Sequence, residues 1–228
     1  GGKAMAYLYP WPRDFRQGVF KYRTTPPGSI PLDKDIERTI ARGVPGTAMP
    51  AWGGALTENE ISGVVEYIKT FSKKFEKEKP KEAISIPAVP LSTSESISRG
   101  KKVYQEMRCA RCHGTDLKGD GPIAADLYDI WKHRIFVYDL TDPNAFKFGF
   151  DKKELFLTLT TGIDGTPMKS YNHLGDEERW ALVSFIESKV RKEEFNPAKH
   201  EIALLTSHID QEINMDPANP LWENVPVQ

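Results

Sequence analysis

The chain has 228 residues, of which 39% are hydrophobic and 28% are charged, and its formal net charge is -1. This length allows one large or two small domains, and the composition is that of a globular protein with an apolar core. A net charge so close to zero gives no support for binding to nucleic acid or to an anionic membrane surface, and no apolar run of about 18 residues predicts a transmembrane helix.

Residues 1–72 form the first predicted lobe. A short helix is expected over Asp35–Ala41, and it ends just before Gly43. A second helix is expected over Glu58–Phe71, where four apolar residues share one stripe: Ile61, Val64, Val65 and Ile68. The loop between these helices, Gly-Val-Pro-Gly-Thr-Ala-Met-Pro-Ala-Trp, contains Met49.

Residues 73–91 are the predicted linker. The segment opens with a Lys/Glu-rich run from Lys73 to Glu82 and continues with Pro87 and Pro90. Charged residues followed by prolines are typical of a solvated connection between domains. A frayed helix end is an equally good interpretation of the charged run.

Residues 92–191 form the second predicted lobe, which begins with a helix over about Glu95–Met107. Ser92 has the spacing of a capping box with Glu95, and Ser94 is the alternative cap. Apolar side chains at helical spacing give this helix a buried side: Ile97, Val103, Tyr104 and Met107.

Directly after this helix, the string Cys109-Ala-Arg-Cys112-His113 matches C-x-x-C-H, the attachment signature of c-type haem. Two thiols at this spacing can add to the two vinyl groups on one edge of a porphyrin, and the adjacent imidazole can then bind the iron. A zinc site would need further ligands, and a thiol redox pair would need a βαβ context; neither is evident. These two haem-free interpretations remain the minor alternatives.

Later in the second lobe, the loop Gly165-Thr-Pro-Met168 supplies a second candidate iron ligand, since haem iron in electron-transfer proteins is often held by His and Met. His133 and His173 are alternatives for this position. A helix is expected before the loop, over Lys152–Thr160, and another after it, over Asp176–Val190.

An internal repeat relates the two lobes. Gly43 and Gly162, Met49 and Met168, and Trp52 and Tyr171 are each separated by the same offset of 119 residues (162 − 43). The predicted helices on either side repeat in the same order. Met49 is therefore predicted to play in the first lobe the part that Met168 plays in the second.

The C-A-R-C-H-G string, the Gly119-Asp-Gly-Pro stretch and the late Met loop together resemble class I c-type cytochromes. The resemblance covers residues 1–190 and implies an all-α fold of two tandem cytochrome c-like lobes. It also implies haem c bound by Cys109, Cys112 and His113, with Met168 and Met49 as distal ligands. Attachment of c-type haem outside the cytoplasmic membrane implies a periplasmic or equivalent location.

The first lobe has Met49 but no C-x-x-C-H of its own. The repeat would place a first haem histidine about a dozen residues before Gly1, so we expect the sequence to be cut at its N-terminus and the intact protein to be dihaem. The rival interpretation is a degenerate lobe that kept the fold and lost its haem.

Residues 192–228 are an expected extended tail. Its segment Asp216-Pro-Ala-Asn-Pro-Leu-Trp-Glu223 is similar to the opening of the haem-carrying subunit of ethylbenzene dehydrogenase-type molybdoenzymes. This likeness implies a molybdenum oxidoreductase as partner. Alternatively, Trp222 anchors a tail that wraps around the lobes.

These observations predict a dihaem electron carrier, or an electron-transfer subunit of a respiratory oxidoreductase complex, with redox proteins as partners and no nucleic acid. Two axial ligands would leave no open position on the iron, so the chain is not expected to be an enzyme. The alternative is a dihaem peroxidase-like enzyme in which one iron is five-coordinate.

Overall fold

The structure is a computed structural model that describes residue 8 and residues 10–191. In this part of the chain the α-helices are α1 (Asp33–Arg42), α2 (Glu58–Lys69), α3 (Lys74–Lys77), α4 (Ser94–Glu106), α5 (Ala110–His113), α6 (Lys152–Thr161) and α7 (Asp176–Lys189). Three short 3-10 helices accompany them: η2 (Phe15–Gln17), η3 (Ala124–Asp126) and η4 (Pro143–Ala145). The described residues contain no β-strand, which confirms the all-α prediction, and none of their helices has the length and hydropathy needed to span a membrane. The predicted tail lies outside the described residues.

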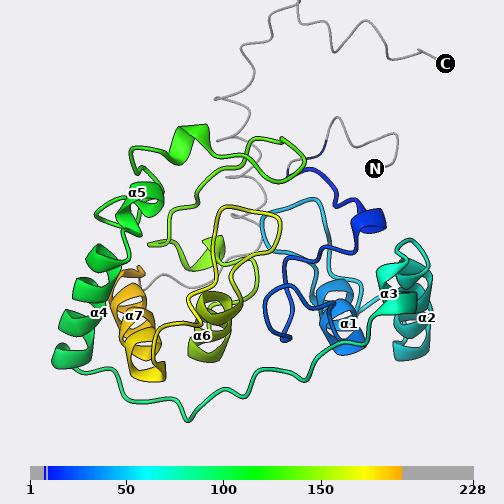
Figure 1. The fold of residues 1–228 in the computed structure, drawn as a ribbon, viewed down its shortest axis with the longest axis horizontal. Helices are drawn as coiled ribbons and strands as arrows, with labels where there is room; N and C mark the ends of the chain where they lie inside the picture. Colours follow the sequence, from blue (N-terminus) through cyan, green and yellow to red (C-terminus); the bar gives the residue numbers. More distant parts are fainter. Residues whose placement is uncertain (1–7, 9, 192–228) are drawn as a thin grey trace, which may run out of the picture.

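Two separate apolar clusters form the core. The smaller one joins Ile36 and Ile40 of α1 to Ile61 and Val65 of α2. The larger one is built from α4, α6 and α7, with Phe156 and Trp180 stacked at 4.3 Å between ring centroids. Figure 1 shows α1–α3 on one side of the molecule and α4–α7 on the other, which is consistent with the predicted two lobes. We call these sides the first and the second lobe.

The helices that flank the two Met loops lie where the periodicity predicts them, within two residues at each end. The largest shift at an N-terminus is in α1, which begins at Asp33 and not at Asp35. Asp35 is buried in the first turn, and its carboxylate accepts hydrogen bonds from the backbone N–H groups of Leu32 and Thr24, both at 3.0 Å. The Asp35 side chain therefore caps the N-terminus of α1 from within its own first turn.

The predicted cap of α4 is wrong by one residue. Thr93, not Ser92 or Ser94, is the N-cap, and its hydroxyl accepts from the N–H of Ser96 at 3.1 Å. The Ser92 hydroxyl is engaged elsewhere, because it donates to Glu187 of α7 at 2.9 Å. This tertiary contact makes the Ser92 hydroxyl unavailable as the cap that the local pattern favours.

The segment over residues 73–91 runs along the bottom of the molecule in Figure 1 and contacts both lobes. Phe75, in α3, packs on the first-lobe cluster. The N–H of Ile84 donates to the carbonyl of Thr24 at 2.8 Å, and Ile86 packs on the second-lobe cluster. Charged residues of the segment are mostly exposed, as a solvated connection requires.

Helices α4 and α7 cross in close contact at Gly100. A Cβ atom at this position would lie 1.9 Å from the carbonyl oxygen of Ala181 and 2.8 Å from Cβ of Phe185. Only glycine allows this approach, and beside it the rings of Tyr104 and Phe185 meet at 5.3 Å between centroids. The crossing fixes the helix that leads into the Cys109–His113 motif.

Candidate haem site

The Cys109–His113 motif follows α4 through one left-handed residue. Arg108 has φ of 56°, a conformation that costs energy in a residue other than glycine. The turn is closed by two hydrogen bonds, from the N–H of Cys109 to the carbonyl of Tyr104 and from the N–H of His113 to the carbonyl of Cys109, both at 3.0 Å. The two cysteines and the histidine are thereby placed on the single turn of α5 and its N-cap.

A glycine loop holds the motif from the other side. The carbonyls of Arg111, Cys112 and His113 accept hydrogen bonds at 3.0–3.2 Å from the backbone N–H groups of Ile123, Gly121 and Gly119, in that order. A Cβ at Gly121 would lie 2.3 Å from the Arg111 carbonyl, so the loop can approach this closely only as glycine. The Gly119-Asp-Gly-Pro stretch therefore holds the backbone of the attachment motif in place.

Burial sets the protonation state of the motif. It lowers the pKa of His113 to about 4, which keeps the imidazole neutral, the form that binds a metal. It raises the pKa of Cys109 to about 11 and also raises that of Cys112, so neither is a reactive thiolate. His113 Nδ1 is buried without a hydrogen-bond partner. A buried neutral imidazole beside two free thiols on the same turn fits covalent haem c.

A zinc site finds less support. Among the residues that the structure describes, no group of three or more His, Cys, Asp or Glu side chains is arranged to hold a metal ion. Two cysteines and one histidine on a single turn thus have no further ligand of these types beside them.

The Met168 loop is a tight hydrogen-bonded turn. The Met168 carbonyl accepts a hydrogen bond from the N–H of Ile163 at 3.0 Å, and the N–H of Met168 donates to the Thr166 hydroxyl at 3.2 Å. Three residues further on, the Tyr171 and Cys109 side chains lie close enough for each to shift the pKa of the other. Met168 and Cys109 also pack on the same core cluster. The structure therefore brings the Met168 loop and the attachment motif together.

Met49 lies in a loop of the same design, beside a cavity. The cavity has a volume of about 430 Å³ and is lined mostly by apolar side chains of the first lobe, among them Phe15, Phe20, Ile36, Ile40, Val44 and Ile68. Met49 lines this cavity directly. The second-lobe motif and the first-lobe Met49 thus belong to two separate candidate sites.

The alternative distal ligands have other contacts. His133 faces Asp129, with 3.4 Å between Nδ1 and Oδ2, and its ring lies 4.0 Å from that of Trp11. His173 is exposed, and its ring lies 6.0 Å from that of Tyr171. Neither contact favours these residues over Met168.

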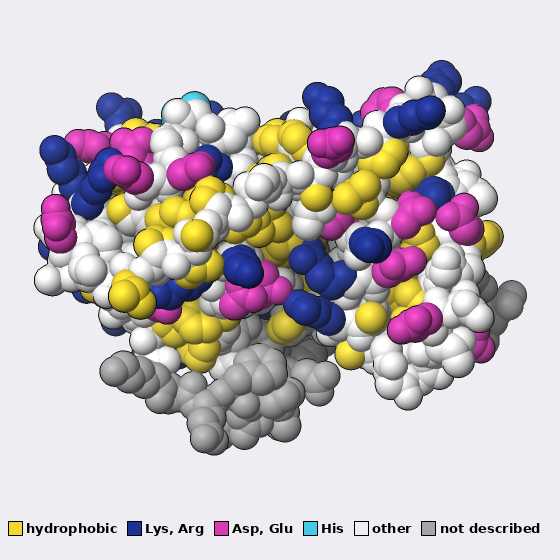
Figure 2. Space-filling model, turned by 90° about the horizontal axis from the view of Figure 1, so that it is seen from below, with side chains coloured by type: hydrophobic (Ala, Val, Ile, Leu, Met, Phe, Trp, Pro, Cys, Tyr) yellow, Lys and Arg dark blue, Asp and Glu magenta, His cyan; other side chains and the backbone are white. Residues whose placement is uncertain are grey.

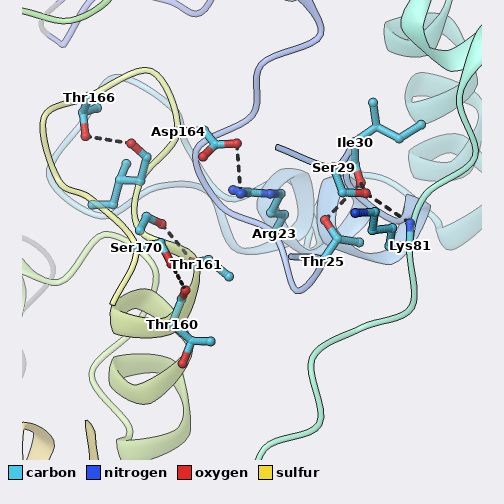
Figure 3. A network of polar contacts seen from close by, with 12 residues as sticks. Arg23, Thr25, Ser29, Ile30, Lys81, Thr160, Thr161, Asp164, Thr166 and Ser170 are labelled. Atoms are coloured by element: carbon cyan, nitrogen blue, oxygen red, sulfur yellow. Dashed lines mark hydrogen bonds and ion pairs between the residues drawn. The ribbon is translucent and has the colours of Figure 1, made fainter. Parts of the chain in front are cut away.

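Two ion pairs join the lobes, and neither was predicted from the sequence; we call this contact region the seam. The Arg23 side chain is fully buried and pairs with Asp164 of the Met168 loop, with 2.9 Å between Nη2 and Oδ2 (Figure 3). Arg42 pairs with Glu154 across the same seam at 2.8 Å. The partners lie more than 100 residues apart, so no local pattern could have paired them.

Fold and site together define a c-type cytochrome, and the chain belongs to the cytochrome c family. The family model for cytochrome c matches residues 97–189. A chain of the reducing HAO-like protein complex Kustc0457/Kustc0458 of Kuenenia stuttgartiensis is similar over 84% of this chain and 87% of its own length, with 38% identity and a TM-score of 0.81. Family membership implies a covalently bound haem c and haem-based electron transfer.

Proposed function

We propose that this chain is a dihaem electron-transfer subunit of a respiratory oxidoreductase complex. In the second lobe, Cys109 and Cys112 would hold the porphyrin, and His113 and Met168 would bind the iron. The observation that carries this assignment is that Met168, Tyr171 and Cys109 all pack on one apolar core cluster, with the Met168 loop beside the attachment motif. The bound haem supplies one-electron chemistry, while the chain fixes the ligands and the burial.

The second haem is proposed for the first-lobe cavity, with Met49 as its distal ligand. The cavity volume of about 430 Å³ and its apolar lining suit a porphyrin ring. Three hydrogen bonds around the methionine are the same in the Met49 loop and in the Met168 loop, and a loop without a ligand would have no reason to keep them.

The exposed face of α2 gives independent support. At the repeat offset, Val64 and Tyr67 of α2 correspond to Val183 and Ile186 of α7. The second pair belongs to the core cluster of the second lobe and is 0% and 7% exposed, whereas Val64 and Tyr67 are 37% and 64% exposed. A helix ending in a C-x-x-C-H motif, as the repeat predicts, together with its haem, would enlarge the apolar core of the first lobe and reduce this exposure.

The proposed partner is a redox protein. The similar Kuenenia chain is part of a reducing HAO-like protein complex, so a subunit role is the natural proposal for this chain as well. A molybdenum oxidoreductase is the more specific proposal, and it rests on the tail segment that ends at Glu223. A periplasmic or equivalent compartment follows from the way haem c is attached.

The test is the number of haems per polypeptide, from pyridine haemochrome absorbance and intact mass, on the protein as isolated. Two covalent haems, with a red-region absorption band of Met-ligated ferric iron, are expected. One haem would overturn the dihaem proposal and make the first lobe a degenerate scaffold. Two haems without the band would favour the five-coordinate, peroxidase-like alternative.

A further inference from the structure

A second cavity lies at the seam, between α1 of the first lobe and residues 143–150 of the second. It has a volume of about 310 Å³, and the rings of Tyr22 and Phe148 stack beside it at 5.7 Å between centroids. On the face shown in Figure 2, Lys and Arg side chains gather where the two lobes meet. Among the described residues, no Asp or Glu side chain lines the cavity, whereas three cationic side chains do: Arg38, Arg42 and Lys147.

Arg38 brings a guanidinium with an unused donor to this cavity. Its Nη2 is buried and has no hydrogen-bond partner. Its Cζ lies 3.8 Å from the ring centroid of Phe148, so a cation–π contact with the opposite lobe holds the guanidinium in place. A buried cationic donor without an acceptor is costly, so an anionic acceptor bound at this point would lower the free energy of the folded state.

The carboxylates that act on Arg38 are engaged elsewhere. Burial lowers the pKa of Arg38, although the charges of Asp35, Glu154 and Asp151 act in the opposite direction. Asp35 accepts from two backbone N–H groups at the start of α1, and Asp151 accepts from two in the first turn of α6. Glu154 forms its ion pair with Arg42 at 2.8 Å. The positive charge of Arg38 therefore has no ion-pair partner among the described residues.

Lys147 brings a second cation, from the second lobe. Its Nζ donates one hydrogen bond of 3.3 Å to the Gly46 carbonyl and lies 4.1 Å from the ring centroid of Tyr138. The carboxylate of Asp142, which also acts on Lys147, accepts from the N–H and the side-chain amide of Asn144 at 2.9 and 2.8 Å. An ammonium has three donors, so Lys147 keeps donors for a further acceptor.

We propose that this cavity binds a small oxyanion, a carboxylate or a phosphate, between Arg38 of the first lobe and Lys147 of the second. A guanidinium and an ammonium are the side-chain groups that bind such oxygens, and a surrounding of aromatic rings strengthens the interaction by excluding water. The site exists only while the lobes are packed together, so the bound anion stabilises their contact. The number of haems does not enter this inference.

The test is calorimetric titration of the holoprotein with inorganic phosphate and, separately, with benzoate. It is done at pH 7, where Lys147 is protonated because its pKa is about 8, in a chloride buffer free of oxyanions. We expect one site per chain for at least one probe, a melting temperature that rises with its concentration, and an unchanged haem spectrum. Binding of phosphate alone or of benzoate alone would assign the class of oxyanion. Binding of neither, or binding that changes the haem spectrum as a new iron ligand would, overturns the site.

Variants locate the bound anion. Arg38→Gln should weaken binding roughly tenfold or more, because a charge-assisted hydrogen bond is lost, and Arg38→Lys should weaken it less. Lys147→Gln should also weaken binding, and it carries the test from the other lobe if Arg38→Gln does not accumulate. Arg99→Gln is the matched control, because Arg99 pairs with Glu177 on the surface of the second lobe, and its affinity should equal that of the wild type.

Two results with these variants would overturn the proposal. Wild-type affinity in both Arg38→Gln and Lys147→Gln would place the anion outside this cavity. An equal loss in Arg99→Gln and Arg38→Gln would show that the anion responds to the overall charge of the protein and not to a built site. Neither result bears on the haem count, which is measured separately, so this proposal and the dihaem proposal can fail independently.

Discussion

The backbone carbonyls of Met49 and Met168 accept the same hydrogen bond, from Val44 and Ile163, at the same length of 3.0 Å. Both methionine N–H groups bond a threonine hydroxyl two residues earlier, at 3.1 and 3.2 Å. Both loops leave their helix at a glycine with φ near 65°, where a Cβ would be within 2.6 Å of the backbone beyond the methionine. Two loops 119 residues apart are therefore built to present a methionine in one and the same way.

Replacing Met168 with alanine should remove the distal ligand and leave the covalent attachment intact. The red-region band of the second-lobe haem should disappear and its reduction potential should fall, since a thioether ligand raises the potential. Absorption spectroscopy and redox titration check this. Met107→Leu is the control, because Met107 packs on the same core cluster next to the motif but is not a proposed ligand. A spectrum unchanged in Met168→Ala would exclude this methionine as the ligand.

Gly100→Ala should destabilise the second lobe by about 1–3 kcal/mol, the usual cost of overpacking. Glycine to alanine in a helix normally stabilises, so the sign of the change reports the contact with Ala181. Chemical denaturation of the holoprotein measures it. Gly54→Ala is the control, because nothing lies within 4 Å of a Cβ at Gly54, and its stability should stay close to that of the wild type. Equal stability of the two variants would argue against the tight crossing.

Asp164→Asn should cost roughly 3 kcal/mol of the unfolding free energy, since it leaves the fully buried Arg23 without its counter-ion. The loss should appear as weaker coupling between the lobes, with two unfolding transitions in place of one. Calorimetry of the variant checks both points. Asp14→Asn, which breaks the pair with the exposed Arg16, should change neither. A variant as stable as the wild type would mean that Arg23 finds another acceptor.

Lys147 should make stability depend on pH in the alkaline range. Burial beside Tyr138 and the Gly46 carbonyl lowers its pKa from 10.5 to about 8 in the folded protein, although the negative charge of Asp142 acts in the opposite direction. Between these two pH values the unfolded chain binds the proton and the folded chain does not, so the unfolding free energy rises as pH increases from about 8 to about 10.5. Denaturation of wild type and Lys147→Met over this range checks the prediction, and the difference between them should shrink as pH rises. A constant difference would contradict it.

Local and repeated features were predictable from the sequence. The helices around Met49 and Met168 follow from the 3.6-residue periodicity of their apolar residues. Their ends follow from glycines, which favour the left-handed turn that terminates each helix. The C-x-x-C-H string gave the haem chemistry, because two thiols and an imidazole at that spacing match one edge of a porphyrin and its iron. Even the pairing of Met49 with Met168 required only the repeat.

Only the tertiary structure decided which groups meet across the seam. Arg23 and Asp164, or Arg13 and Trp131, carry no local signal for one another, because their approach depends on how the lobes pack. The cap of α4 moved to Thr93 for the same reason, since Glu187 of α7 takes the Ser92 hydroxyl. Periodicity and spacing determine the helices and the haem-binding motif, because these depend on neighbours in the sequence. Burial and long-range contacts determine which side chains pair across the lobes, because these depend on how the lobes pack.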